Sequence, residues 1–75
     1  MTKLFINADT CLEFSTNMAA LKYVARQGLQ KFILVKHYPS SKTVLVFNPF
    51  FTGSKCVEYM NTEAEALKYV GSFLN

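Results

Sequence analysis

Few side chains in this sequence could carry out acid–base, nucleophilic or metal chemistry. His37 is the single histidine, and the two cysteines, Cys11 and Cys56, belong to no CxxC pair. A structural zinc site needs four ligands, which this set cannot supply. Because His37 adjoins Tyr38 on a strand that leads into a turn, we expect it to pack at the surface rather than to act as a catalytic base.

Two glutamates deserve separate consideration, because Glu13 and Glu58 stand at matching places in two similar segments. Paired carboxylates can act as acid and base. Glutamates on a solvent-exposed side of a sheet are nevertheless far more common as solvated groups than as catalytic groups. The sequence also lacks a Gly-rich phosphate loop. We therefore expect a protein that is not an enzyme and that needs no metal or cofactor.

The residues best suited to binding are two adjacent aromatics, Phe50 and Phe51, on a segment punctuated by Pro49 and Gly53. Two large rings on a short loop cannot easily both turn inward. One interpretation is that a ring closes the end of the core. The other is that the pair forms an exposed anchor, of the kind that carries much of the energy at protein interfaces. We predict a partner-binding site at Phe50 and Phe51.

The basic residues suggest an alternative surface. The net charge is +3 and the sequence pI is about 9.0, but lysine and arginine are scattered along the chain. Nucleic-acid-binding proteins usually cluster such charge, so an ordinary solvated surface is the simpler interpretation. A β-ribbon with a basic tip can still enter a groove of nucleic acid. The alternative nucleic-acid site surrounds the hairpin tip at 36–42 and consists of Lys31, Lys36, His37, Tyr38, Lys42 and Lys55.

Composition favours one small domain, residues 1–75, that contacts another chain. Apolar residues make up 51% of the sequence and charged residues only 17%, below the roughly 25% of an average soluble domain. Sparse charge leaves apolar surface uncovered, and such surface usually meets a partner, here a second copy or another protein. No apolar run is long enough for a signal peptide or a membrane span, so we expect no membrane partner and a cytoplasmic location.

Hydrophobic periodicity predicts an α+β fold in the order β-β-α-β-β-β-α. The run that opens 32–38 has four consecutive apolar residues, which is typical of a central strand covered on both faces. Thr62 and Glu65 predict a capping box for the last helix. The predicted strands are 3–7, 11–15, 32–38, 43–48 and 55–60, and the predicted helices start after Thr16 and Thr62.

A repeated pattern connects the two halves: CLEFSTNMAALKYV at 11–24 resembles CVEYMNTEAEALKYV at 56–70. It predicts two similar ββα units, arisen by duplication or by convergence, that form one antiparallel sheet of about five strands with both helices on one face. Matching residues should then be buried alike: Leu21 and Val24 with Leu67 and Val70, and Cys11 with Cys56 as buried thiols.

Part of this order resembles a known family. From Thr16 onward, α-β-β-β-α is similar to the element order of the double-stranded RNA-binding domain. That family places a lysine cluster at the start of its last helix, where this chain has Thr62-Glu63-Ala64-Glu65. Phosphate would be repelled there, so the resemblance stops at the order of the elements.

Size and the lack of catalytic groups lead to one functional expectation. We expect a non-enzymatic binding protein, of the kind found among phage and mobile-element accessory proteins, that inhibits or modulates a host macromolecular complex by protein–protein contact. An anti-defence inhibitor is one example. The alternative is a nucleic-acid-binding accessory protein that uses the basic hairpin tip.

Overall fold

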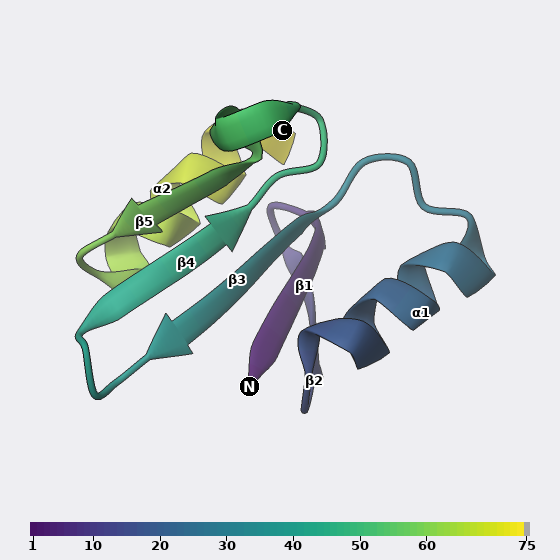
Figure 1. The fold of residues 1–75 in the computed structure, drawn as a ribbon. Helices are drawn as coiled ribbons and strands as arrows, with labels where there is room; N and C mark the ends of the chain where they lie inside the picture. The colour runs from purple at the N-terminus through teal and green to yellow at the C-terminus, as the bar shows by residue number, and fades with distance from the viewer. Residues whose placement is uncertain (75) are drawn as a thin grey trace.

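The fold contains the five strands and two helices that the sequence predicts, in the predicted order, and the α+β class is confirmed (Figure 1). The structure is a computed structural model and describes residues 1–74. Its elements are β1 (Thr2–Asn7), β2 (Thr10–Phe14), α1 (Asn17–Gln27), β3 (Ile33–Tyr38), β4 (Thr43–Phe47), the short 3-10 helix η1 (Gly53–Cys56), β5 (Val57–Met60) and α2 (Glu63–Leu74).

The strands form one antiparallel sheet in the order β2-β1-β3-β4-β5, with β3 at its centre. Ile33, Leu34 and Val35 are all buried, although alternate residues of a strand point to opposite faces. Both faces of β3 must therefore be covered. This confirms the central position that the continuous apolar run predicts.

The two helices lie on opposite faces of the sheet, which corrects the prediction that they share one face. Ala66 and Val70 of α2 pack with Phe5, Ile33 and Val35. Leu4 and Leu34 alternate with these strand residues and therefore point to the opposite face of the sheet. There they pack with Ala20 and Val24 of α1. Figure 1 accordingly shows α1 and α2 on different sides of the strands. The physical reason is that β1 and β3 are apolar on both faces, so each face needs its own helix.

Strand β1 contacts both helices at adjacent residues. The Thr2 hydroxyl is buried and donates a hydrogen bond to Oδ1 of Asn17, the first residue of α1. Lys3 points to the other face, and its Nζ lies 2.6 Å from Oε1 of Glu63, the first residue of α2. The start of each helix is thus fixed to the same short segment of one strand.

Threonine side chains cap the starts of both helices at the two positions that the sequence predicts. The Thr16 hydroxyl accepts a hydrogen bond from the Ala19 amide at 3.1 Å, and Gly28 caps the other end of α1 with a positive φ of 66°. At α2, the Thr62 hydroxyl accepts from the Glu65 amide at 3.2 Å. The Glu65 carboxylate accepts a hydrogen bond from the Thr62 hydroxyl at 3.5 Å and not from the Thr62 backbone amide, so only one half of the predicted capping box is present.

Because α1 covers β1, β2 and the part of β3 around Leu34, this side of the sheet stays uncovered from the end of β3 across β4 and β5 (Figure 1). Cross-strand pairs join Lys36 to Leu45 and Leu45 to Tyr59 on this side. We call this surface the open face. It consists of Lys36, Tyr38, Leu45, Phe47, Val57 and Tyr59, all half-buried or exposed.

The repeated helix pattern holds in the structure, but the predicted core residues need correction. In both copies of ALKYV the alanine and valine are buried, while Leu21 and Leu67 are 38% and 45% exposed. A helix has 3.6 residues per turn, so the residue that follows a buried alanine turns away from the sheet. Met18, one turn before Leu21 on the same helix, is also exposed.

The repeated strand pattern occupies unlike surroundings in the two halves. Leu12 and Phe14 of β2 face α1. Their counterparts in β5, Val57 and Tyr59, point to the same side of the sheet, away from α2, because Glu58 between them pairs with Val46 on the α2 side. The matching residues of β2 and β5 thus point to the same face of the sheet, but α1 and α2 cover opposite faces. An origin by duplication therefore stays a prediction.

The cysteines are not the buried matching pair that the sequence predicts. Cys11 is exposed on the edge strand β2, beyond the strands that α2 covers. Cys56 is half-buried and ends η1, where its Sγ donates to the Gly53 carbonyl oxygen at 3.0 Å. Gly53 adopts a φ of 66°, so the chain turns there and β5 starts only at Val57.

We predict that truncating Leu4 costs far more stability than truncating Leu67. Leu4 is fully buried, so Leu4→Ala should lower the free energy of unfolding by about 2–5 kcal/mol. Leu67→Ala should cost less than about 1 kcal/mol, because the side chain is already half in water. Urea unfolding of the two variants measures both. Equal costs would show that α2 buries Leu67 and that the described face of the helix is wrong.

Candidate functional site

The loop between β4 and η1 is held in place by one buried side chain, Asn48. The backbone amide of Asn48 donates a hydrogen bond to the Cys56 carbonyl at 2.7 Å. The backbone carbonyl of Asn48 accepts one from the Phe51 amide at 3.3 Å. Its side-chain oxygen accepts from the Phe50 amide at 3.0 Å, and its side-chain amide donates to the Tyr69 hydroxyl, also at 3.0 Å. Asparagine before proline is typical of a turn, and here that turn fixes the backbone of both aromatics.

Phe50 and Phe51 meet a third aromatic, Phe73 of α2. The ring centroids lie 5.4 Å apart between Phe50 and Phe51, 5.3 Å between Phe50 and Phe73, and 5.8 Å between Phe51 and Phe73. Such edge-on and tilted contacts are favourable aromatic geometries. Tyr69 stacks on Phe73, and the Lys31 ammonium lies 5.4 Å from the centre of the same ring. We call Phe50, Phe51 and Phe73 the aromatic cluster.

The aromatic cluster is a surface feature. Phe50 is 72% exposed and Phe51 is 37% exposed, so Phe50 does not close the end of the core. Phe51 is more covered and lies against Phe73, which packs on the core, so partner binding at these two rings stays a prediction. The sequence missed Asn48 and the participation of Phe73. The Asn48-Pro49 pair was a sequence signal for the role of Asn48. The participation of Phe73 is revealed only by its contacts in the folded structure.

The structure divides the basic residues of the alternative site. Lys36 and Tyr38 lie together on the open face, with the Lys36 ammonium 5.3 Å from the centre of the Tyr38 ring. His37 points to the α2 side, since it pairs with the buried Val44. Lys42 is in the β3–β4 turn, with a positive φ of 54°.

Lys31 and Lys55 do not join that group. Lys31 precedes β3 and Lys55 lies in η1 before β5, so both are at the end of the sheet opposite the β3–β4 turn. A six-residue strand such as β3 separates the two ends by roughly 20 Å. The hairpin tip therefore lacks the wider basic cluster that the sequence left open.

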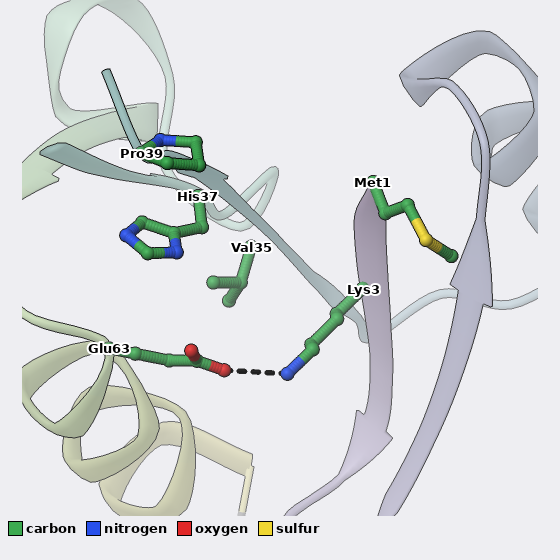
Figure 2. Close-up of a pocket in the computed structure, with 6 residues that line it drawn as sticks. All are labelled: Met1, Lys3, Val35, His37, Pro39 and Glu63. Atoms are coloured by element: carbon green, nitrogen blue, oxygen red, sulfur yellow. Dashed lines mark hydrogen bonds and ion pairs between the residues drawn. The ribbon is translucent and has the colours of Figure 1, made fainter. Parts of the chain in front are cut away.

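A pocket of 250 Å³ lies on the α2 side, between the start of β1, the end of β3 and the start of α2 (Figure 2). Six residues line it: Met1, Lys3, Val35, His37, Pro39 and Glu63. Within it, the hydrogen bond from Lys3 lowers the pKa of the Glu63 carboxyl below its usual 4.5. The same bond raises the pKa of the Lys3 ammonium above 10.5. The pocket is therefore lined by the Lys3–Glu63 ion pair and by His37.

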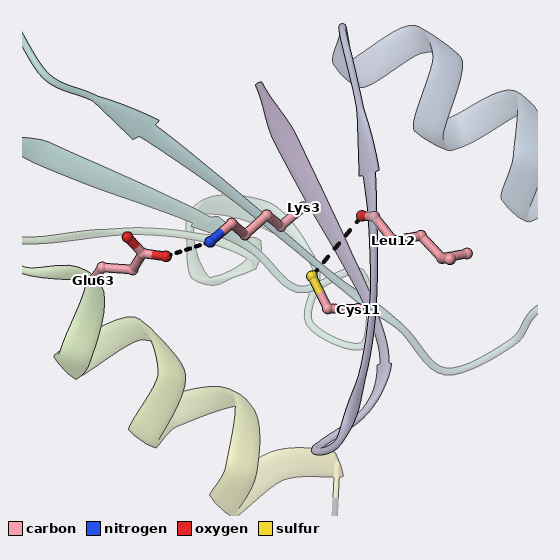
Figure 3. A network of polar contacts seen from close by, with 4 residues as sticks. All are labelled: Lys3, Cys11, Leu12 and Glu63. Atoms are coloured by element: carbon pink, nitrogen blue, oxygen red, sulfur yellow. Dashed lines mark hydrogen bonds and ion pairs between the residues drawn. The ribbon is translucent and has the colours of Figure 1, made fainter.

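The other groups considered for chemistry lie apart. Glu13 and Glu58 are on the two edge strands, β2 and β5, so four strand spacings of about 4.8 Å prevent their pairing. Figure 3 shows Cys11 directed at the Leu12 carbonyl, with Lys3 and Glu63 nearby. Partial burial of the sulfur raises the pKa of the Cys11 thiol above 9.0, which disfavours the reactive thiolate. Residues 1–74 contain no cluster of three metal-ligating side chains.

Comparison with known proteins gives no match: no protein-family model, curated protein or solved structure is significantly similar to the chain. Within the described residues, neither helix has the length and apolar character needed to cross a bilayer.

We predict that the Lys3–Glu63 pair contributes a small, pH-dependent stability. Its side chains are 36% and 38% exposed, so solvent screens the pair and Glu63→Gln should lower the free energy of unfolding at neutral pH by at most about 1 kcal/mol. The pKa of Glu63 is lowered by folding, so this contribution is present above pH 4.5 and is lost as the pH falls through the folded pKa.

Denaturant unfolding between neutral and acidic pH measures this difference. Glu58→Gln is the control, because Glu58 is an exposed glutamate that forms no ion pair among the described residues. The wild-type and Glu63→Gln curves should converge below pH 4.5. A difference that stays constant with pH, or equal effects of the two substitutions, would show that the pair does not stabilise the fold.

Proposed function

We propose that this protein is a non-enzymatic binding protein whose partner is another protein, docked on the aromatic cluster. One observation carries the proposal: Phe50 keeps 72% of its surface in water although it belongs to a fixed three-ring arrangement. Exposed aromatic surface of this kind is costly to maintain, and it usually meets a partner.

The arrangement of the loop supports this role because the binding groups are held before any partner arrives. Asn48 fixes the backbone at Phe50 and Phe51, and Phe73 holds both rings from α2. Little side-chain entropy would then be lost on binding, which favours affinity. Aromatic residues at the centre of an interface commonly dominate its energy.

Lys31 adds a polar element at the margin of the cluster. Its ammonium lies over the Phe73 ring and is exposed. An acidic group of a partner can pair with it there while apolar residues contact the rings. An apolar surface with an acidic rim is therefore the complement that we propose.

The narrower prediction concerns biological setting. An accessory protein of a phage or mobile element that inhibits a host complex remains a prediction, based on small size and on the lack of catalytic groups in the sequence. The same holds for a homodimer, in which a second copy would cover exposed apolar surface. Sedimentation at micromolar concentration distinguishes a monomer from a dimer.

We predict that Phe50→Ser abolishes partner capture without destabilising the fold. The matched control is Tyr59→Ser, since Tyr59 is also 72% exposed but lies on the open face. Both variants should melt within a few degrees of wild type. In high-salt capture from a lysate of the native host, Phe50→Ser should lose the partner that wild type and Tyr59→Ser retain. In titrations with that partner the loss should exceed about 2 kcal/mol.

Two results would contradict this proposal. A large drop in the melting temperature of Phe50→Ser would show that the ring closes the core. Capture of the same partner by Phe50→Ser and wild type would show that the aromatic cluster is not the docking site.

A further inference from the structure

The open face combines exposed flat rings with lysine side chains. Tyr59 on β5 is 72% exposed and Tyr38 on β3 is 37% exposed. Leu45 lies on β4, the strand between these two, and is half-buried. The groups that a partner meets first are therefore tyrosine rings. Lys36 lies on the same face beside Tyr38, and Lys42 follows in the β3–β4 turn.

The acidic side chains all lie elsewhere. Glu13 pairs with Lys3 and Glu58 pairs with Val46, so both point to the α2 side. Glu63 and Glu65 belong to α2 itself. The remaining acid, Asp9, is in the β1–β2 turn, at the end of the sheet away from the β3–β4 turn.

Basic residues therefore occur on both sides of the molecule, whereas no carboxylate lies on the open face, a property that the order of charges in the sequence conceals. The α1 side carries Lys22 and Arg26 on α1 in addition to Lys36 on the open face, and α1 contains no acidic residue. A positive surface without carboxylates attracts a polyanion. Its flat aromatic groups also offer stacking surfaces for bases.

We propose that the open face binds single-stranded nucleic acid, with bases stacked on Tyr38 and Tyr59 and phosphates held by Lys36 and Lys42. Strands β3 and β5 are two spacings apart, about 10 Å across the sheet, so one extended strand can reach both rings. A duplex keeps its base faces inside the stack, and a sheet with exposed aromatics therefore selects single strands.

A second copy of the chain fits the open face less well. A two-fold dimer places the same patch of each chain in contact. Lys36 and Lys42 of both copies would then approach one another with no carboxylate between them, which is unfavourable. Nucleic acid supplies the negative charge that this arrangement lacks.

The proposed site differs from the hairpin-tip site that the sequence suggested. Lys36, Tyr38 and Lys42 remain, and Tyr59 joins them from β5. His37 points to the other face of the sheet. This site is also independent of protein docking at the aromatic cluster, which lies on the α2 side, so either proposal can fail alone.

Fluorescence anisotropy with labelled oligothymidylate, oligouridylate and a duplex of equal length tests the proposal. We predict binding of the single strands and weaker binding of the duplex. If Lys36 and Lys42 contact two phosphates, the slope of log K against log salt should be about −1.4. Lys36→Gln should make the slope shallower by about half. Lys68→Gln on α2 is the matched control, and it should leave the slope unchanged.

Aromatic variants test stacking separately from charge. Tyr59→Ser should weaken binding of the single strand about tenfold, within the range for loss of one stacked base. Phe50→Ser, with the same exposure on the other side, should bind like wild type. Tyr59→Leu keeps apolar surface on the strand but removes the flat ring, so it should weaken binding as Tyr59→Ser does.

Four outcomes would overturn the proposal. They are no binding of single strands by folded wild type at low salt, binding of the duplex equal to that of the single strands, equal losses in Tyr59→Ser and Phe50→Ser, and a concentration-dependent dimer that Tyr59→Ser disrupts. The last result would assign the open face to a second copy. Circular dichroism of each variant confirms that it is folded before binding is measured.

Discussion

The structure depends on a constraint at β1: this strand must be buried on both faces at once. Thr2 and Leu4 point to one side and meet Asn17 and the core under α1. Lys3 and Phe5 point to the other and meet α2. An apolar strand in the middle of a sheet cannot leave either side in water. Two helices on opposite faces satisfy this requirement, whereas two helices on one face would expose half of the residues that β1 and β3 bury.

The open face is a consequence of the same constraint. Helix α2 packs along β1, β3, β4 and β5, but α1 lies mainly over β1 and β2 and contacts β3 at Leu34. With two helices for a five-stranded sheet, one side remains uncovered beyond α1. The edge strand β2 extends past α2 in the same way, which leaves Cys11 exposed. The surfaces available for binding are thus set by how far each helix reaches.

Sequence predicted the features that local chemistry determines. Thr16 and Thr62 mark helix starts through hydrogen bonds to backbone amides within a few residues. The apolar run at Phe32–Val35 indicates a central strand for the same reason, since burial on both faces needs no knowledge of the partner elements. These signals sufficed for the element order and the fold class.

The side of the sheet to which each helix returns depends on long-range packing, and the repeated pattern gave the wrong answer. A period of two in a strand shows which residues share a face but not which helix covers it. The absence of carboxylates from the open face and the third ring of the aromatic cluster also follow from tertiary structure. Phe50 and Phe51 were identified from loop composition alone, whereas Phe73 and Tyr59 required the fold.

Helices α1 and α2 cover opposite faces of one sheet. Methyl–methyl nuclear Overhauser effects in solution test it most directly. The account predicts cross-peaks from Ala66 and Val70 to Val35 and Val46, and from Ala20 and Val24 to Leu4 and Leu34. Cross-peaks from the α2 methyls to Leu4, Leu34 or Leu45 would contradict it, because they would place both helices on one face and close the open face.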